Sequence, residues 1–180
     1  MFVQTQNTPN PNSLKFLPGK KVSNDIPIEI TDKNESNNEL IRNILSINGV
    51  TGIFLSDDFL SVNKDEKIEW EDLKHIIISF INDYYSNGNE IVIDKESKKS
   101  SNLNLSLIEK KIINILETKV RPAVARDGGD IKFKEFKNGV VTVSLQGSCS
   151  GCPSSTLTLK QGVQNLLCHY IPEIKEVIAI

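Results

Sequence analysis

The chain contains the run GSCSGCPSS at residues 147–155, in which Cys149 and Cys152 lie two residues apart between a predicted strand and a predicted helix. The 180 residues include only 3 Cys, so a pair in one short loop needs a chemical reason. Thiolates at this spacing bind one soft metal centre or form a redox disulfide. They supply two ligands, whereas a metal–thiolate site usually has four. The source of the missing ligands is therefore the main question that this sequence raises.

The surroundings of the two cysteines favour the thiolate form. Pro153 follows Cys152 directly, and proline is preferred at the first position of a helix. Both sulfurs are therefore expected at a helix N-terminus, where the dipole and free N–H groups stabilise a negative charge. The neighbouring residues Ser148, Ser150 and Gly151 are small. We expect the two sulfurs to be accessible and able to bind iron or zinc.

The chain itself offers few further ligands. Cys168 and His169 lie on the same predicted helix, about 24 Å beyond Cys152 at 1.5 Å per residue. His75 belongs to the other half of the chain and falls opposite the apolar face of its helix, so we expect it to be solvated. The remaining ligands are expected from a second copy of the chain or from a partner. Two copies would give four thiolates, which suits an iron–sulfur cluster or zinc.

Composition limits the class of protein. The hydrophobic content of 38% is low for one large core and favours two small cores. A formal net charge of −2 argues against nucleic acid or an anionic membrane as the main partner. No run is long and apolar enough to span a membrane, and the N-terminus resembles neither a secretory signal nor an Arg-rich transit peptide. An odd number of cysteines predicts a reducing compartment. We expect the cytoplasm of a bacterium, or the mitochondrial matrix if this is a mature eukaryotic chain.

The first half, residues 1–88, is predicted to follow the order β-β-α-β-β-α. A Pro/Asn turn at 7–12 joins the first two strands, and a turn interpretation is preferred there over a binding loop. A capping box at 36–39 predicts a helix that ends near Gly49. Two strands within 50–62 are split by Asp57-Asp58. The second helix ends at Asn87-Gly88, with a short strand possible at 91–93, and its apolar face comprises Trp70, Leu73, Ile77, Phe80, Ile81 and Tyr84.

The second half is predicted to follow the order α-β-β-α-β over residues 105–180, after a polar linker at 89–104 that is rich in Lys and Ser. Its first helix opens with a capping box at 106–109 and is disturbed by Pro122. Asn138-Gly139 predicts a tight hairpin turn. A helix over 153–171 and a strand over 173–180 complete this half. The fold class is therefore α+β, in two small domains.

Two further features have a plain structural interpretation. The stretch Asp127-Gly128-Gly129-Asp130 contains two carboxylates, but a helix stop followed by a tight turn is the preferred interpretation. Cys168 projects away from the main apolar stripe of its helix, so it is predicted to take no part in the site, being partly exposed or in a secondary contact. That stripe comprises Leu159, Val163, Leu166, Leu167 and Tyr170.

These residues together resemble a known family. The second half is similar to the NifU C-terminal, or Nfu-type, domain, and the first half looks like the N-terminal domain that accompanies it in Nfu proteins. The matching stretches of the second half are Arg121-Pro122, residues 127–131, residues 147–155 and Thr158-Leu159-Lys160. The matching stretches of the first half are residues 8–16 and 70–74.

The resemblance implies an iron–sulfur cluster carrier that hands a [4Fe-4S] cluster to apo-proteins and is not an enzyme. It carries over Cys149 and Cys152 alone as cluster ligands, implies a homodimer when the cluster is bound, and implies an upstream assembly scaffold as donor. The other cysteine-bearing domains of full NifU proteins are absent, so carriage and transfer are expected rather than assembly. A thiol–disulfide oxidoreductase that uses the same cysteine pair is the main alternative, and a structural zinc dimer is a third.

Overall fold

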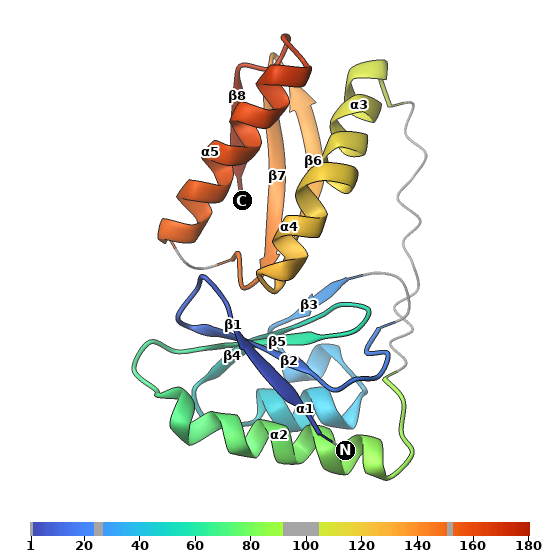
Figure 1. Ribbon diagram of the computed structural model, residues 1–180, viewed down its shortest axis with the longest axis vertical. Helices are drawn as coiled ribbons and strands as arrows, with labels where there is room; N and C mark the ends of the chain where they lie inside the picture. The colour runs from blue at the N-terminus through green and yellow to red at the C-terminus, as the bar shows by residue number, and fades with distance from the viewer. Residues whose placement is uncertain (1, 24–26, 92–104, 151–152) are drawn as a thin grey trace. The chain divides into compact units, whose positions relative to one another are not determined.

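The computed structural model describes residues 2–23, 27–91, 105–150 and 153–180, with residues 153–155 described by their backbone alone. The chain divides into two compact units, Met1–Asp94 and Lys95–Ile180. Each unit combines helices with a sheet of its own, so the α+β class is confirmed (Figure 1). The predicted linker bounds, 89–104, fall mostly outside the described residues and stay a prediction.

Unit 1 is an antiparallel sheet with two helices on one face (Figure 1). Its strands lie in the order β1-β2-β5-β4-β3. The bounds are β1 Gln4–Asn7, β2 Ser13–Leu17, β3 Ile28–Ile30, β4 Val50–Leu55 and β5 Leu60–Lys64, with a short 3₁₀ turn at Lys33–Glu35 and the helices α1 Glu39–Leu45 and α2 Trp70–Ser86. The predicted hairpin at the N-terminus is confirmed as the antiparallel pair β1 and β2.

The core of unit 1 lies between the sheet and its helices. α2 contributes Leu73, Ile77, Ile81 and Tyr85, which recur every four residues and are fully or almost fully buried. Helical periodicity therefore predicted the core face of α2, except at its end, where Tyr85 is buried and Tyr84 is only partly so. His75 is exposed on the same helix, which confirms the expectation that it is solvated.

Four local details of unit 1 differ from the predictions. The residue that caps α1 is Asn38, whose side chain accepts a hydrogen bond from the backbone N–H of Ile41, so the helix begins later than a capping box at 36–39 implies. α1 also ends at Leu45, and Gly49 serves the turn into β4 with φ +92°. β3 was missed because three residues are too short for a periodic signal. Ile91 is not in a strand, and the rest of the predicted strand at 91–93 lies outside the described residues.

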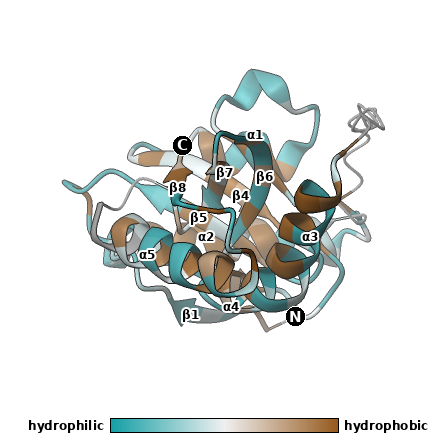
Figure 2. Cartoon of the chain, turned by 90° about the horizontal axis from the view of Figure 1, so that it is seen from above, coloured by the Kyte–Doolittle hydropathy of each residue, from teal (hydrophilic) through white to brown (hydrophobic). Residues whose placement is uncertain are grey.

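Unit 2 is a three-stranded sheet with helices packed against it (Figure 1). Its strands lie in the order β6-β7-β8, with β6 and β7 antiparallel and β8 parallel to β7. The bounds are α3 Leu107–Ile115, a π turn at Leu116–Val120, α4 Arg121–Arg126, β6 Gly129–Lys137, β7 Val140–Gly147, α5 Pro153–Tyr170 and β8 Glu176–Ala179. Figure 2 shows both hydrophobic (brown) and hydrophilic (teal) residues on α3 and α5, as amphipathic helices require.

A helix cap and a turn of unit 2 follow directly from the sequence. Both hydrogen bonds of the capping box at the start of α3 are present. The backbone N–H of Glu109 donates to the Ser106 hydroxyl, and the backbone N–H of Ser106 donates to the Glu109 carboxylate. Asn138 and Gly139 have φ of 53° and 83°, as a tight hairpin turn between β6 and β7 requires. Both predictions are confirmed.

The predicted disturbance of the first helix at Pro122 is confirmed, because a π turn separates α3 from α4. The helical path continues beyond it, since the proline lies in the first turn of α4. Other details of unit 2 differ from the predictions. Tyr170, predicted on the apolar stripe of α5, is 49% exposed, and the buried residue at this end is Ile171, which directly follows the helix. β8 is also shorter than the predicted strand at 173–180.

Candidate functional site

Cys149 lies in the turn that joins β7 to α5, as predicted. β7 ends at Gly147, whose φ of 70° lets the chain leave the sheet abruptly. Ser150 closes the turn, because its backbone N–H and its hydroxyl both donate to the carbonyl of Gly147, at 3.1 and 2.8 Å. α5 then begins at Pro153. Cys152 lies outside the described residues, so its role as a ligand stays a prediction.

Cys149 is buried, and the expectation of an accessible, activated thiolate was wrong for this residue. Only 6% of it is exposed, and it belongs to the hydrophobic core of unit 2. Burial raises the pKa of the Cys149 thiol to about 11, and the nearby carboxylates of Asp127 and Asp130 act in the same direction against a lowering hydrogen bond from Ser148. At neutral pH the buried thiol is therefore protonated.

The turn at residues 127–130 packs directly against the cysteine turn. Gly128 has φ +82°, which confirms the predicted helix stop and tight turn. Its carbonyl accepts a hydrogen bond from the N–H of Ser148 at 3.2 Å, and the Ser148 hydroxyl donates to the carbonyl of Asp127. The two glycine-containing turns, far apart in sequence, therefore form one structure around Cys149.

Gly129 allows the closest of these contacts. A Cβ atom at this position would lie 2.8 Å from the Sγ of Cys149 and 2.6 Å from the carbonyl oxygen of Gln146. Both separations are far below ordinary van der Waals contact. Sequence reasoning assigned Gly129 to a turn and missed its role beside the sulfur. The sequence did contain a signal for this contact. The hairpin turn at Asn138-Gly139 makes Gly129 the strand partner of Gly147, which places Gly129 beside the start of the cysteine turn.

An ion pair fixes the start of β6 to α4. The guanidinium of Arg121 donates to both carboxylate oxygens of Asp130, at 2.8 and 3.3 Å, and Asp130 is only 4% exposed. This two-point contact holds the residue that follows Gly129. On the other side of the site, the Thr156 hydroxyl donates to the carbonyl of Cys149 at 3.2 Å and ties the turn to α5. The backbone around Cys149 is thus held from α4, β6 and α5.

Cys168 and His169 lie at the opposite end of α5. At 1.5 Å per residue, Cys168 is about 22 Å from the first turn of that helix. Its thiol is partly buried and donates to the carbonyl of Ile174 at 3.2 Å, which confirms the predicted secondary contact. His169 is exposed and packs edge-on against Tyr170. Neither side chain is near Cys149.

Within the described ranges, no group of three or more His, Cys, Asp or Glu side chains could hold a metal ion. No helix in the same part of the chain is long and apolar enough to cross a membrane.

Known proteins resemble both units. Residues 112–178 match the family model described as NifU-like domain, and residues 3–88 match the model described as scaffold protein Nfu/NifU N terminal. The human mitochondrial NFU1 iron-sulfur cluster scaffold homolog is 41% identical over 180 residues, which cover 98% of this chain and 71% of the human protein. NifU-like protein 4, mitochondrial, of Arabidopsis thaliana is 40% identical over 187 residues, which cover 98% of this chain and 65% of that protein.

A solved structure also resembles part of the chain. The solution structure of a NifU-like protein from Saccharomyces cerevisiae is 35% identical and covers 53% of this chain and 87% of its own, with a TM-score of 0.46. The fold defines a small α+β protein of two units, with one cysteine turn in the second. The chain belongs to the Nfu family of NifU-like proteins, and it spans about two thirds of the length of the relatives given above.

Proposed function

We propose that the protein carries a [4Fe-4S] cluster between two chains, each of which contributes Cys149 and Cys152, and transfers that cluster to apo-proteins. The cluster is the cargo of the protein. The observation that carries the proposal is the cysteine turn itself: one pair of cysteines before α5, in a chain whose relatives are named iron-sulfur cluster scaffolds.

Ligand number supports a cluster shared between chains. The sequence contains 3 Cys, and the third, Cys168, lies at the far end of α5. One chain therefore has two thiolates available at the site, whereas a [4Fe-4S] cluster is held by four. Two copies related by a two-fold axis supply four equivalent ligands and close the assembly as a dimer.

The burial of Cys149 supports a protein that carries and releases a cluster rather than one that retains it permanently. To bind iron, the thiol must lose its proton and leave its contact with Gly129 in the core. When the cluster departs, the sulfur regains this buried position, and Ser148 regains its hydrogen bonds to the turn at 127–130. The folded apo form thus competes with the cluster for the ligand and weakens its retention.

The alternative, a thiol–disulfide oxidoreductase, fits the site less well. Catalytic cysteines of such enzymes have lowered pKa values and partial exposure, whereas burial raises the pKa of Cys149 and removes it from solvent. β7, α5 and β8 form a parallel βαβ unit with the cysteine turn at the start of its helix, so the burial of Cys149, and not the topology, separates the two alternatives. We therefore propose a role in binding and transfer without enzymatic turnover.

The proposed partners follow from this role. A carrier needs an upstream scaffold that supplies the cluster and apo-proteins that receive it. Since the relatives are named as mitochondrial, we place the exchange in the mitochondrial matrix, or in the cytoplasm if the source is bacterial. Nucleic acid and membranes have no part in the proposal, in keeping with the net charge of −2.

Cluster loading is expected to convert the protein from monomer to dimer, because one chain supplies half of the ligands. Light scattering coupled to size-exclusion chromatography, before and after anaerobic reconstitution, measures this change. Removing the cluster with a chelator should return the monomer mass. A loaded species that keeps the monomer mass without any added thiol ligand would contradict a cluster shared between chains.

The Cys168→Ser variant is expected to load as much iron and sulfide as the unaltered protein. Cys168 is remote from the site, and a serine hydroxyl keeps a donor for the Ile174 carbonyl. Iron and sulfide assays after reconstitution provide the comparison. Loss of most of the iron would show that Cys168 belongs to the ligand set.

A further inference from the structure

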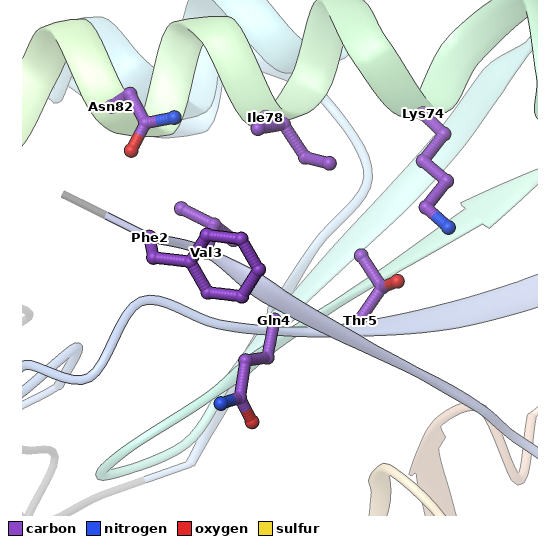
Figure 3. A pocket seen from close by; sticks show the side chains of 7 residues that line it. All are labelled: Phe2, Val3, Gln4, Thr5, Lys74, Ile78 and Asn82. Atoms are coloured by element: carbon purple, nitrogen blue, oxygen red, sulfur yellow. The ribbon is translucent and has the colours of Figure 1, made fainter.

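Unit 1, whose sequence contains no cysteine, has a groove between the N-terminal part of the chain and α2. It has a volume of about 490 Å³ and is lined by Phe2, Val3, Gln4, Thr5, Lys74, Ile78 and Asn82 (Figure 3). The lining combines an aromatic ring, aliphatic side chains, one cation and polar groups. It contains no acidic residue.

The groove exists because α2 extends beneath the edge of the sheet. Leu73, Ile77 and Ile81 face the core under the sheet. Each groove residue of α2 follows one of these in sequence and is therefore rotated by about 100° around the helix axis. That rotation places a second row, Lys74, Ile78 and Asn82, beside the outermost strand. Figure 3 shows the row along one side of α2, with Thr5 directed toward Lys74.

The strand above this row is an open edge. β1 is the first strand in the sheet order, and β2 is its one strand partner among the described residues. Natural sheets usually protect such edges with lysine, proline, a bulge or a very short strand, and β1, with 4 residues, has the last of these features. β1 reads Gln4-Thr5-Gln6-Asn7, contains neither lysine nor proline, and pairs with β2 in a continuous register. Its outer backbone groups can therefore accept a further strand.

Two side chains of the groove lack a partner of their own in the described part of the chain. The Oδ1 atom of Asn82 is buried there and has no hydrogen-bond partner, so a donor in the groove would satisfy it once the side chain turns toward that donor. Lys74 forms no ion pair with any described residue, although its side chain is only partly exposed. Phe2 is 81% exposed at the same end as Asn82. The groove thus offers an acceptor, a cation and an apolar surface in a row.

We propose that this groove binds an extended segment of a partner protein, which pairs with β1 as a sixth strand and directs alternate side chains onto α2. Strand addition at a sheet edge is a common mode of peptide recognition, with backbone pairing for affinity and pockets for alternate side chains. Lys74, Ile78 and Asn82 are separated by about 6 Å each along the helix. Alternate residues of a strand are separated by about 6.7 Å, so the two rows match.

The row on α2 defines the chemistry of the segment. Lys74 is complementary to a carboxylate of the segment, and Ile78 and Phe2 are complementary to an apolar side chain. The Oδ1 atom of Asn82 is complementary to a hydrogen-bond donor. The segment therefore carries an acidic, an apolar and a donor side chain at alternate positions. This inference concerns unit 1 alone and stands whether or not the cluster proposal holds.

A capped peptide, Ser-Thr-Glu-Thr-Leu-Thr-Gln-Thr-Ser, presents that pattern and serves as the probe. Titrated into the full-length protein labelled with ¹⁵N, it is expected to produce saturable shifts at the amides of β1 and of the groove residues on α2. Lys74→Glu is expected to weaken binding at least tenfold, and a peptide with Lys in place of Glu should recover it in that variant. Lys33→Glu, at an exposed lysine that does not line the groove, is the matched control and should change nothing.

Methylation of the peptide backbone distinguishes strand addition, which uses backbone hydrogen bonds to β1, from binding through side chains alone. N-methyl groups at the positions that face β1 should abolish binding, whereas the same groups at the alternate positions should not. Absence of saturable shifts, or binding that Lys74→Glu leaves unchanged, would overturn the proposal. Concentration-dependent shifts of β1 without peptide would overturn it as well, because the occupant would then be a second copy of the chain.

Discussion

The Cys149→Ser and Cys152→Ser variants are each expected to lose stable cluster loading completely. One substitution removes one ligand from each chain and therefore two of the four in the proposed dimer. The site is a short turn before α5, and the nearest other cysteine, Cys168, is too far along that helix to substitute. Anaerobic reconstitution followed by iron and sulfide assays and an absorption spectrum measures the loss.

The Cys168→Ser variant serves as the control for both substitutions, since it removes one thiol without removing a proposed ligand. The Cys149 and Cys152 variants should remain folded, with circular dichroism spectra like that of the unaltered protein. Retention of more than half of the cluster in either variant would contradict the assignment of that cysteine as a ligand.

The Gly129→Ala variant is expected to destabilise unit 2 and to disrupt the cysteine turn. The added methyl group would lie 2.8 Å from Cys149 Sγ and 2.6 Å from the carbonyl of Gln146, so strand, turn or sulfur must move. Overpacking of this kind costs about 1–3 kcal/mol in the free energy of unfolding. Urea denaturation followed by circular dichroism measures that cost, and reconstitution of the folded variant measures its effect on cluster loading.

The Gly162→Ala variant is the matched control, because an added Cβ at this exposed position of α5 would meet no atom within 4 Å. Alanine replaces glycine there inside a helix, so the variant should be more stable by roughly 0.5–1 kcal/mol. Equal stabilities for the two variants would contradict the close packing of Gly129 against Cys149.

The elements with strong local signals were predictable from the sequence. The core face of α2 follows from helical periodicity, and the turn between β6 and β7 follows from Asn138-Gly139. The strand-to-helix position of the cysteine turn follows from Gly147 and Pro153. In each case the residues that determine the structure are neighbours in sequence, so a local pattern contains the information.

The features that the sequence did not reveal depend on distant contacts. The burial of Cys149 results from packing against Gly129, on the partner strand, and local reasoning about the helix dipole pointed to an exposed thiolate instead. The persistence of helix through Pro122 depends on a π turn that no propensity predicts. β3 forms because β4 provides a partner, although its own three residues carry no signal.

The position of Cys149 changes how the cysteine pair is interpreted. In the proposed carrier, the Cys149 sulfur would leave its buried position to bind the cluster, and its return would favour release of the cargo. Cluster transfer is therefore the property that separates the proposed carrier from a storage site and from an oxidoreductase.

Transfer to an apo-protein with an empty [4Fe-4S] site, followed by the return of that protein's activity, is the most direct test. We expect the loaded protein to restore activity while its own absorption falls in step, and we expect the metal-free protein to show no turnover in a disulfide-reduction assay. Strong disulfide reduction by the metal-free protein, together with no transfer from the loaded protein, would contradict the proposed carrier function.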